Sequence, residues 1–271
     1  MYVETKSTIP VALTIAGSDS GGGAGIQADL RTFAFHCVHG TSAITCVTAQ
    51  NTLGVMRVDA MPPEAVIAQI QAVVKDIGVQ AVKTGILLNK EIIAAVVEQV
   101  EALQMKNLVV DPVMVSRTGA QLIDDEAVKI LSQRLIPLAA VVTPNRYEAQ
   151  ILSGLEINTL DDMRAAAHFI HCKLQAKVVL VKGGGLLGNE RGVDIWFDGD
   201  NMEILATKQV DTKNTHGTGC TLSAAIAANL AKGHDLAGAV QQAKKYVTHA
   251  LEYALDIGEG QGPVGHFYPL L

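Results

Sequence analysis

The stretch Asn214-Thr-His-Gly-Thr-Gly-Cys-Thr-Leu-Ser-Ala-Ala225 leads a loop of small and hydroxylated residues into an alanine-rich apolar run that continues to Leu230. This order predicts a loop followed directly by the start of a helix. Gly217 and Gly219 let the backbone curl so that several N–H groups point at one spot, and the helix dipole adds partial positive charge there. Such a helix start binds anions, most often a phosphate. The spacing alone also fits an ordinary glycine-rich helix entry.

Short apolar runs rich in β-branched residues alternate with longer helical patterns along the rest of the chain. We predict strands at 11–16, 42–47, 80–83, 108–110, 139–143, 177–181, 193–197 and 202–207, the last two forming an antiparallel hairpin. Predicted helices occupy 24–35, 64–76, 90–103, 124–134, 146–152, 160–174, the end of the 214–220 loop to 230, and 236–255. Because no Pro- or Ser-rich linker interrupts the alternation, the sequence predicts one α/β domain over 1–271. Its sheet is expected to be mostly parallel, with helices on both faces.

Segments with polar or glycine-rich composition follow many of the predicted strands. In parallel sheets, ligands gather beyond the carboxyl ends of the strands. The segments that follow strands in this way are Gly17–Gly23, Asp111, Asn145–Glu148, Lys182–Gly185 and the 214–220 loop. We therefore expect them to meet at one edge of the sheet.

The overall charge and composition narrow the classes of partner. The formal net charge is −6 and no block of Lys and Arg occurs, which argues against nucleic acid or an anionic membrane as the main partner. The first six residues lack the basic-then-apolar order of a signal peptide, and the uncharged run 214–231 is too polar to span a membrane. Four cysteines without Cys-x-x-Cys spacing suit reduced thiols. The sequence predicts a cytoplasmic protein.

Common nucleotide and metal motifs are absent or fail on context. The dipeptide Gly-Lys occurs nowhere, which excludes a Walker A loop. The match Gly183-Gly-Gly-Leu-Leu-Gly188 to a dinucleotide-binding fingerprint is followed by a predicted strand where a helix is required. His168-x-x-His171-Cys172 has helical spacing for a metal, but no second cluster completes a ligand shell.

Two other features point to a phosphate-handling site. Gly17–Gly25 contains five glycines in nine residues, a composition that allows close backbone approach to a flat ligand or a phosphate, although a flexible turn would look similar. Asp111 and Glu148 each follow a strand, and two carboxylates beside phosphate sites are what Mg²⁺ uses, usually through water. Taken singly, either acid also fits a capping or solvated residue.

Seven blocks stand in order along the chain and together are highly specific: Gly17-Ser-Asp-Ser-Gly-Gly-Gly-Ala-Gly-Ile-Gln-Ala-Asp29, Thr48-Ala-Gln-Asn-Thr52, Val110-Asp-Pro-Val-Met114, Thr143-Pro-Asn-Arg-Tyr-Glu148, Val181-Lys-Gly-Gly184, Asn214-Thr-His-Gly-Thr-Gly-Cys220 and Gly262-Pro-Val-Gly-His-Phe267. With these blocks, nearly the whole chain closely resembles the hydroxymethylpyrimidine/phosphomethylpyrimidine kinases of thiamine biosynthesis, which belong to the ribokinase-like superfamily. The resemblance implies a three-layer ribokinase-like fold and a homodimer. It also implies ATP- and Mg²⁺-dependent phosphorylation of 4-amino-5-hydroxymethyl-2-methylpyrimidine, and then of the monophosphate to the diphosphate.

The resemblance also implies roles for individual residues. Gln50 would hydrogen-bond the aminopyrimidine edge, and the same pocket would be lined by Gly17, Ala24 and Asp29. The metal and phosphate side would hold Asp111 and Glu148. The residues implied for ATP binding are Asn145, Lys182, Thr218 and, as a weaker candidate, Lys213.

Cys220 stands where most ribokinase-like enzymes carry an aspartate as catalytic base. A thiol at a helix N-terminus has a lowered pKa, so we expect Cys220 to act as a thiolate base. The backbone N–H groups of Gly217–Cys220 would hold the developing charge. Because phosphoryl transfer passes through a loose transition state, this anion site is expected to matter more than the base. A small buried hydrophobic residue is the alternative interpretation of Cys220.

Two rival functions stay open at this point. A pyridoxal kinase on the same scaffold would also take a flat hydroxymethyl heterocycle. A non-catalytic vitamin-binding protein would bind the pyrimidine without consuming ATP, although the acidic residues, Lys182 and the glycine-rich helix start argue against it.

Overall fold

The computed structural model describes residues 9–114 and 122–271, in which nine strands form one sheet of order β3-β2-β1-β4-β5-β6-β7-β8-β9. The prediction that the first six residues are not a signal peptide concerns residues that lie outside the described ranges. The strands are β1 (Val11–Asp19), β2 (His39–Gln50), β3 (Val55–Ala60), β4 (Ala81–Thr84), β5 (Leu108–Val110), β6 (Val141–Val142), β7 (Val179–Val181), β8 (Asp194–Phe197) and β9 (Met202–Leu205).

Strands β2, β1, β4, β5, β6 and β7 are parallel neighbours, whereas β3 at one edge and β8 and β9 at the other pair antiparallel. The chain runs outward from β1 to β2 and then returns to β4 on the other side of β1. The strand order therefore reverses between β1 and β4. Such a reversal opens a crevice at the carboxyl ends of the strands, where ligands of α/β proteins bind.

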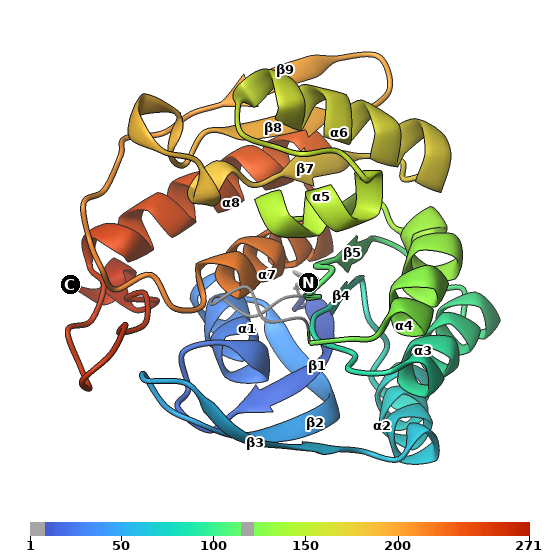
Figure 1. Ribbon diagram of the computed structural model, residues 1–271. Coiled ribbons are helices and arrows are strands. Elements are labelled where there is room, and N and C mark those ends of the chain that lie inside the picture. Colours follow the sequence, from blue (N-terminus) through green and yellow to red (C-terminus); the bar gives the residue numbers. More distant parts are fainter. Residues whose placement is uncertain (1–8, 115–121) are drawn as a thin grey trace, which may run out of the picture.

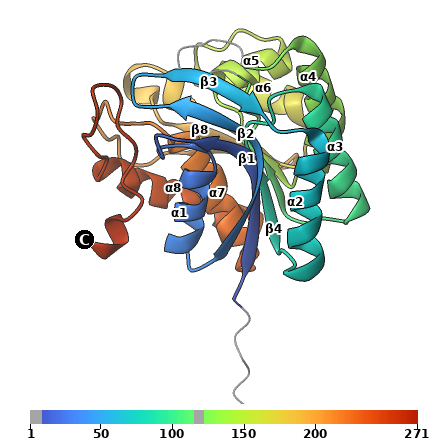
Figure 2. The ribbon, with the colours of Figure 1, turned by 90° about the horizontal axis from the view of Figure 1, so that it is seen from below.

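Helices cover both faces of the sheet, as predicted (Figures 1 and 2). One face carries α1 (Gly25–Phe35), α7 (Thr218–Ala231) and α8 (Leu236–Glu252), and the other carries α2 (Pro63–Asp76), α3 (Lys90–Ala102), α4 (Asp125–Ile130), α5 (Arg146–Ser153) and α6 (Leu160–Leu174). Parallel strands buried on both faces read as continuous apolar runs, which is the pattern of Leu108–Val110 and Val179–Val181.

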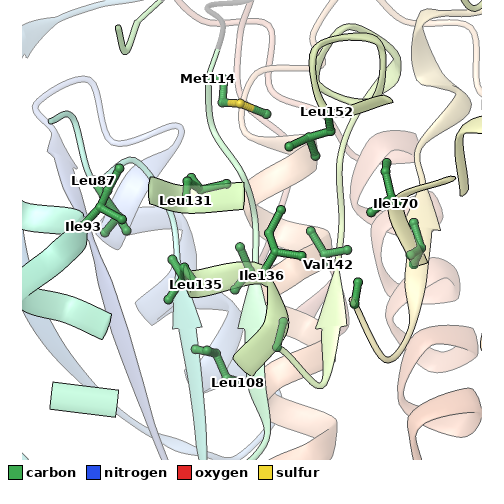
Figure 3. Packing of buried hydrophobic residues seen from close by; sticks show 14 of the residues in the cluster. Leu87, Ile93, Leu108, Met114, Leu131, Leu135, Ile136, Val142, Leu152 and Ile170 are labelled. Carbon is green, nitrogen blue, oxygen red and sulfur yellow. The ribbon is translucent and has the colours of Figure 1, made fainter. Parts of the chain in front are cut away.

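Helix α7 is buried along its length from Thr221 to Ala231 and packs between α1, α8 and the sheet. Its alanines let neighbouring elements approach closely, so the helix is held rigidly. The larger apolar cluster lies on the opposite face, where Leu131, Ile136, Val142 and Leu152 pack together (Figure 3). The body of α7 is therefore enclosed by packing, whereas its first residues, Gly217–Cys220, are only partly buried.

Three elements differ from the sequence-based expectation. Strand β1 continues to Asp19 and so includes the first residues of the predicted loop Gly17–Gly23. Strand β3 was not predicted, although Met56–Ala60 alternates apolar and polar residues; all six of its residues are exposed. The predicted helix 124–134 is an α-helix only to Ile130 and continues as a π turn, Leu131–Leu135, and a 3₁₀ turn, Ile136–Leu138. Pro137 has no backbone N–H to donate, which accounts for the tightened end.

Candidate phosphate-transfer site

The N-terminus of α7 presents open backbone amides. Gly217 is the N-cap residue in a left-handed conformation, φ +80°, and no side chain caps the helix. Thr218 N–H donates to Thr215 O at 3.3 Å, whereas among residues 9–114 and 122–271 the N–H groups of Gly219 and Cys220 have no acceptor. Of the amides of Gly217–Cys220 that were expected to hold an anion, those of Gly219 and Cys220 are thus available and that of Thr218 is paired; the dipole of a 14-residue helix points at the open ones.

Lys182 lies directly over this helix tip. A Cβ atom on Gly219 would stand 3.3 Å from Lys182 Nζ, so the missing side chain makes room for the ammonium group. Nζ of Lys182 also donates to Asp111 Oδ1 at 2.8 Å, and Ser223 Oγ donates to Asp111 Oδ2 at 3.1 Å. Burial opposes the ammonium form, but Asp111 and Glu148 raise the pKa of Lys182 above its ordinary value. A fixed positive charge therefore sits beside the open amides.

Glu148 and Asn145 are joined at the start of α5 by a capping box. Asn145 N–H donates to Glu148 Oε2 at 2.7 Å, and Glu148 N–H donates to the Asn145 side chain at 3.0 Å. Burial raises the pKa of Glu148 to about 8, with the nearby Asp111 carboxylate adding to the effect and Lys182 opposing it. The pKa of Asp111 is instead lowered, because Lys182 and Lys83 outweigh its burial.

These carboxyl groups fit a divalent cation bound together with a nucleotide. Two buried carboxyl groups lie beside the single positive charge of Lys182, and burial is the main cause of the raised pKa of Glu148, with the Asp111 carboxylate adding to it. A cation there would take the place of the Glu148 proton. Mg²⁺ usually binds through one or two carboxylates plus substrate phosphates, so a cluster of three protein ligands is not required. In the described part of the chain no such three-residue cluster occurs.

Asp29 does not line an open pocket, which corrects the expectation that it contacts substrate. Its side chain is fully buried, and Oδ2 accepts from Lys83 Nζ at 2.8 Å and from Thr14 Oγ1 at 2.6 Å. Burial opposes the charged form of Lys83, but Asp29 outweighs it and raises the pKa of Lys83. The two side chains form an ion pair between α1 and the sheet that is closed to solvent.

Cys220 differs from expectation in its protonation. The residue is partly buried at the first turn of α7. Burial raises the pKa of its thiol to about 11; Lys83 opposes this increase, and the Asp29 and Asp111 carboxylates add to it. The sequence-based expectation of a lowered pKa is thus wrong for this state, because loss of solvent and two carboxylates outweigh the helix dipole.

The β1–α1 loop approaches the same helix tip through Asp19 and His216. Asp19 Oδ2 lies 2.9 Å from His216 Nε2 and also accepts from the N–H groups of Gly23, at 3.1 Å, and Ala24, at 2.8 Å. Gln50 Nε2 lies 3.4 Å from His216 Nε2. Gln50 and Ala24 therefore lie near His216, which directly precedes the α7 tip.

The remaining predicted residues are Gly17, Thr218 and Lys213. Gly17 is buried, and a Cβ there would meet Cys46 Sγ at 2.6 Å, so its lack of a side chain serves packing against β2. Thr218 Oγ1 donates to Thr215 O at 2.6 Å. Lys213 is 70 % exposed, and its Nζ lies 3.2 Å from Asp256 Oδ1.

Sequence reasoning assigned no separate role to Asp19, Lys83, His216 or Ser223. The partners of His216 and Ser223 lie 197 and 112 residues away in sequence, so no local pattern connects them. Asp19 is the one acidic residue within Gly17–Gly25, and this was the sequence feature that could have marked it as a site residue.

Comparisons with known proteins agree with this geometry. The model of the family described as phosphomethylpyrimidine kinase matches residues 19–265. A hydroxymethylpyrimidine/phosphomethylpyrimidine kinase of Synechococcus elongatus is 59% identical over 262 residues, which cover 97% of this chain and 99% of the relative. Among solved structures, the ADP complex of Bacillus subtilis pyridoxal kinase has a TM-score of 0.91 at 40% identity, covering 97% of this chain and 100% of that one. A phosphomethylpyrimidine kinase from Clostridium difficile has a TM-score of 0.79 at 43% identity, covering 89% of this chain and 99% of that one.

The predicted three-layer fold is thus that of the ribokinase-like kinases. Across residues 9–114 and 122–271, the structure contains no helix that combines the length and the apolar character needed to cross a membrane. With matches of this extent in both sequence and structure, the chain belongs to the phosphomethylpyrimidine kinase family.

Proposed function

We propose that the edge of the sheet beside α7 transfers the γ-phosphoryl group of ATP to a hydroxymethylpyrimidine. As a kinase of this family, the chain phosphorylates 4-amino-5-hydroxymethyl-2-methylpyrimidine and then its monophosphate, a step of thiamine biosynthesis. The observation that carries the proposed site is the pair of open amides, Gly219 and Cys220, beneath the Lys182 ammonium. Amides fixed by a rigid helix stabilise charge on a transferring group without reorganising.

The acceptor substrate is proposed to bind between the glycine loop and β2. Gln50 would pair with the aminopyrimidine edge, with Ala24 beside it. The hydroxymethyl oxygen would then point at the α7 tip, and its bond to the γ-phosphorus would form as the bond to the β-phosphate oxygen breaks. The open N–H groups of Gly219 and Cys220 and the Lys182 ammonium would hold the transferring phosphoryl group.

A Mg²⁺ ion is part of the proposal. Asp111 and Glu148 would hold it together with the nucleotide phosphates, and Asn145 would keep Glu148 in place through the capping box. The ion would neutralise charge on the phosphates. Ser223 and Thr143 orient the Asp111 carboxylate, at 3.1 and 3.3 Å.

Cys220 keeps a limited place in the mechanism. A thiol with a pKa of about 11 is protonated at neutral pH and cannot accept the hydroxyl proton in that state. Cys220 acts as the base only when bound substrate lowers this pKa, and Lys83 is the cation that favours the thiolate. In a loose transition state the proton leaves late, so placement of the phosphoryl group dominates the rate.

Pyridoxal phosphorylation is a second candidate activity. The observation that favours it is the TM-score of 0.91 to a pyridoxal kinase solved with ADP.

We also propose a homodimer, which sedimentation equilibrium of the purified chain tests directly.

A coupled ATP assay with three acceptors run in parallel tests the function: the aminopyrimidine alcohol, its monophosphate and pyridoxal. We expect Mg²⁺-dependent turnover on the first two, with kcat/KM at least about tenfold above that for pyridoxal. Binding of the pyrimidine with no ATP consumed would instead assign the chain a non-catalytic role. Preference for pyridoxal would reverse the order of the two candidate activities.

A further inference from the structure

The side-chain carboxamide of Gln50 lies between a hydroxyl and an imidazole. Gln50 Oε1 is 3.2 Å from Thr48 Oγ1, and Gln50 Nε2 is 3.4 Å from His216 Nε2. The backbone of Gln50 is also fixed, since its N–H donates to Ser20 Oγ and its carbonyl accepts from the same hydroxyl, both at 2.8 Å. The register of β2 against β3 shifts at Gln50, which re-aims this side chain.

The protons available to these groups constrain the carboxamide. His216 Nε2 lies 2.9 Å from Asp19 Oδ2. Burial raises the pKa of Asp19, but the hydrogen bonds from His216 and from the loop amides outweigh burial, so the pKa of Asp19 is lowered. A carboxylate only accepts, so His216 Nε2 carries a proton and is a donor. A donor facing the Gln50 NH₂ group makes no hydrogen bond with it.

The hydroxyl on the other side leads to the same conclusion. Thr48 Oγ1 has one proton, and its shorter contact, 3.0 Å, is to Ser18 O. With that proton committed, Oγ1 can only accept, which requires the Gln50 NH₂ group beside Thr48 and not the carbonyl oxygen. Turning the carboxamide by 180° suits both neighbours: Nε2–H donates to Thr48 Oγ1, and Oε1 lies 3.4 Å from His216 Nε2, where it shares the proton that is donated mainly to Asp19 and replaces a contact between two donors. Such a turn barely changes the shape of the side chain.

The orientation matters because the two candidate substrates present opposite patterns. Aligned on the hydroxymethyl group, the 4-aminopyrimidine offers a donor, the exocyclic amine, and next to it an acceptor, the ring nitrogen. A 4-formyl-3-hydroxypyridine offers an acceptor at the first position and a donor at the second. A carboxamide held in one orientation is complementary to only one of these patterns, and it leaves unpaired polar groups against the other.

We propose that Thr48 and His216 fix the orientation of the Gln50 carboxamide, and that this orientation selects the 4-aminopyrimidine over the 4-formyl-3-hydroxypyridine. Thr48 and His216 are positioning residues, because they act on the substrate through Gln50. The inference deepens the proposed function and depends on Gln50 meeting the heterocycle there.

Thr48→Val removes the hydroxyl and keeps the side-chain shape, whereas Thr48→Ser keeps the hydroxyl and serves as the matched control. We expect Thr48→Val to lower the ratio of kcat/KM for the aminopyrimidine to that for pyridoxal by about tenfold to a hundredfold, because a freed carboxamide turns to suit either ligand. The change should lie mainly in KM. Thr48→Ser should keep the ratio of the unmodified enzyme.

His216→Phe provides an independent arm, since it removes the donor on the other side of Gln50. It should lower the same ratio, even where kcat falls for both substrates because His216 adjoins the α7 tip. An unchanged ratio in both Thr48→Val and His216→Phe, with thermal unfolding like that of the unmodified chain, overturns the inference. If the unmodified chain fails to phosphorylate the aminopyrimidine at all, the proposed function itself fails.

Discussion

Two of the lysine–aspartate pairs in the described part of the chain have the same separation and different surroundings. Lys83 Nζ and Asp29 Oδ2 are 2.8 Å apart with both side chains fully buried, whereas Lys182 Nζ and Asp111 Oδ1 are 2.8 Å apart with 13% and 3% exposed. Lys83 is enclosed by α1 and the sheet. Lys182 faces Gly219, where a missing side chain leaves its ammonium group next to the open amides. We therefore expect the sealed pair to be a structural element and the open pair to bind an anion.

The comparison shows that access and not chemical identity decides the role of such a pair. A sealed pair has already exchanged water for its partner, so loss of one member leaves an uncompensated charge in the core. A pair that opens on one side keeps donors for a ligand, and its lysine can bind phosphate as well as carboxylate. Substitutions at the two sites should therefore separate stability from activity.

The largest effect is expected from Lys83→Met, because it leaves the Asp29 carboxylate buried without a cation. The free energy of unfolding should fall by about 3–5 kcal/mol, measured by urea titration. The double variant Lys83→Met with Asp29→Leu removes both charges and should recover most of that loss. A single variant as stable as the unmodified chain would show that the sealed pair is not structural.

Lys182→Met should act mainly on catalysis. The loss of one fixed positive group at the developing charge is expected to reduce kcat by about a hundredfold to a thousandfold. Asp111 retains Ser223 and Thr143 as donors, so the loss of stability should be smaller than for Lys83→Met. If urea titration shows the reverse order of stabilities, the distinction between the sealed and the open pair is lost.

Substitution at Gly219 tests whether open space under Lys182 is what makes that pair functional. Gly219→Val should displace the ammonium group and reduce kcat by about a hundredfold, whereas Gly219→Ala meets only the mobile end of Lys182, 3.3 Å away, and should be milder. Cys220→Ala should keep measurable turnover, within about tenfold of the unmodified enzyme, because the base contributes less than the anion site. Equal losses in Gly219→Val and Cys220→Ala would refute that ranking.

The smallest expected effect is the contribution of His266 to the pH dependence of stability. Unlike the two lysines, His266 is buried beside a hydroxyl, Thr221 Oγ1 at 2.9 Å, and not beside a carboxylate. Burial, with Arg31 adding, lowers the pKa of His266 to about 4. Its unfolded pKa is about 6.5, so as pH falls through that value the unfolded chain takes up the proton first and stability is lost down to about pH 4. Between pH 7 and pH 5 this loss should be about 2 kcal/mol by urea titration. His266→Gln keeps a donor near Thr221 and should remove this part of the pH dependence; an equal slope in both proteins would contradict it.

Much of the fold was predictable because its elements carry strong local patterns. The buried parallel strands, the hairpin of β8 and β9, and helices such as Leu160–Leu174 follow from apolar runs and helical spacing. Strand β3 was missed because an edge strand whose residues are all exposed needs only backbone pairing with β2. The early end of α4 was missed because Leu131–Leu138 continue to coil, as a π turn and a 3₁₀ turn, so the helical pattern of apolar residues continues as well.

The site was predictable where its residues directly follow strands. The positions of Lys182 and Asp111 at strand ends follow from the pattern of the sheet. The protonation of Cys220 was predicted with the wrong direction, because a helix terminus is visible in sequence whereas burial beside two carboxylates is not. Asp29 was assigned to the substrate pocket because it belongs to the Gly17–Asp29 block. Its pairing with Lys83 was not visible in the sequence, because the two residues are 54 positions apart.

The contact between Gly217 and Gly23 has a consequence for genetics. A Cβ on Gly217 would lie 1.8 Å from the carbonyl oxygen of Gly23, so two stretches of main chain touch with no side chain between them. Where side chains meet, a second mutation can relieve a harmful one by shrinking the partner. Here neither residue has anything to shrink, and a screen for intragenic suppressors of a Gly217 mutant should recover only true revertants.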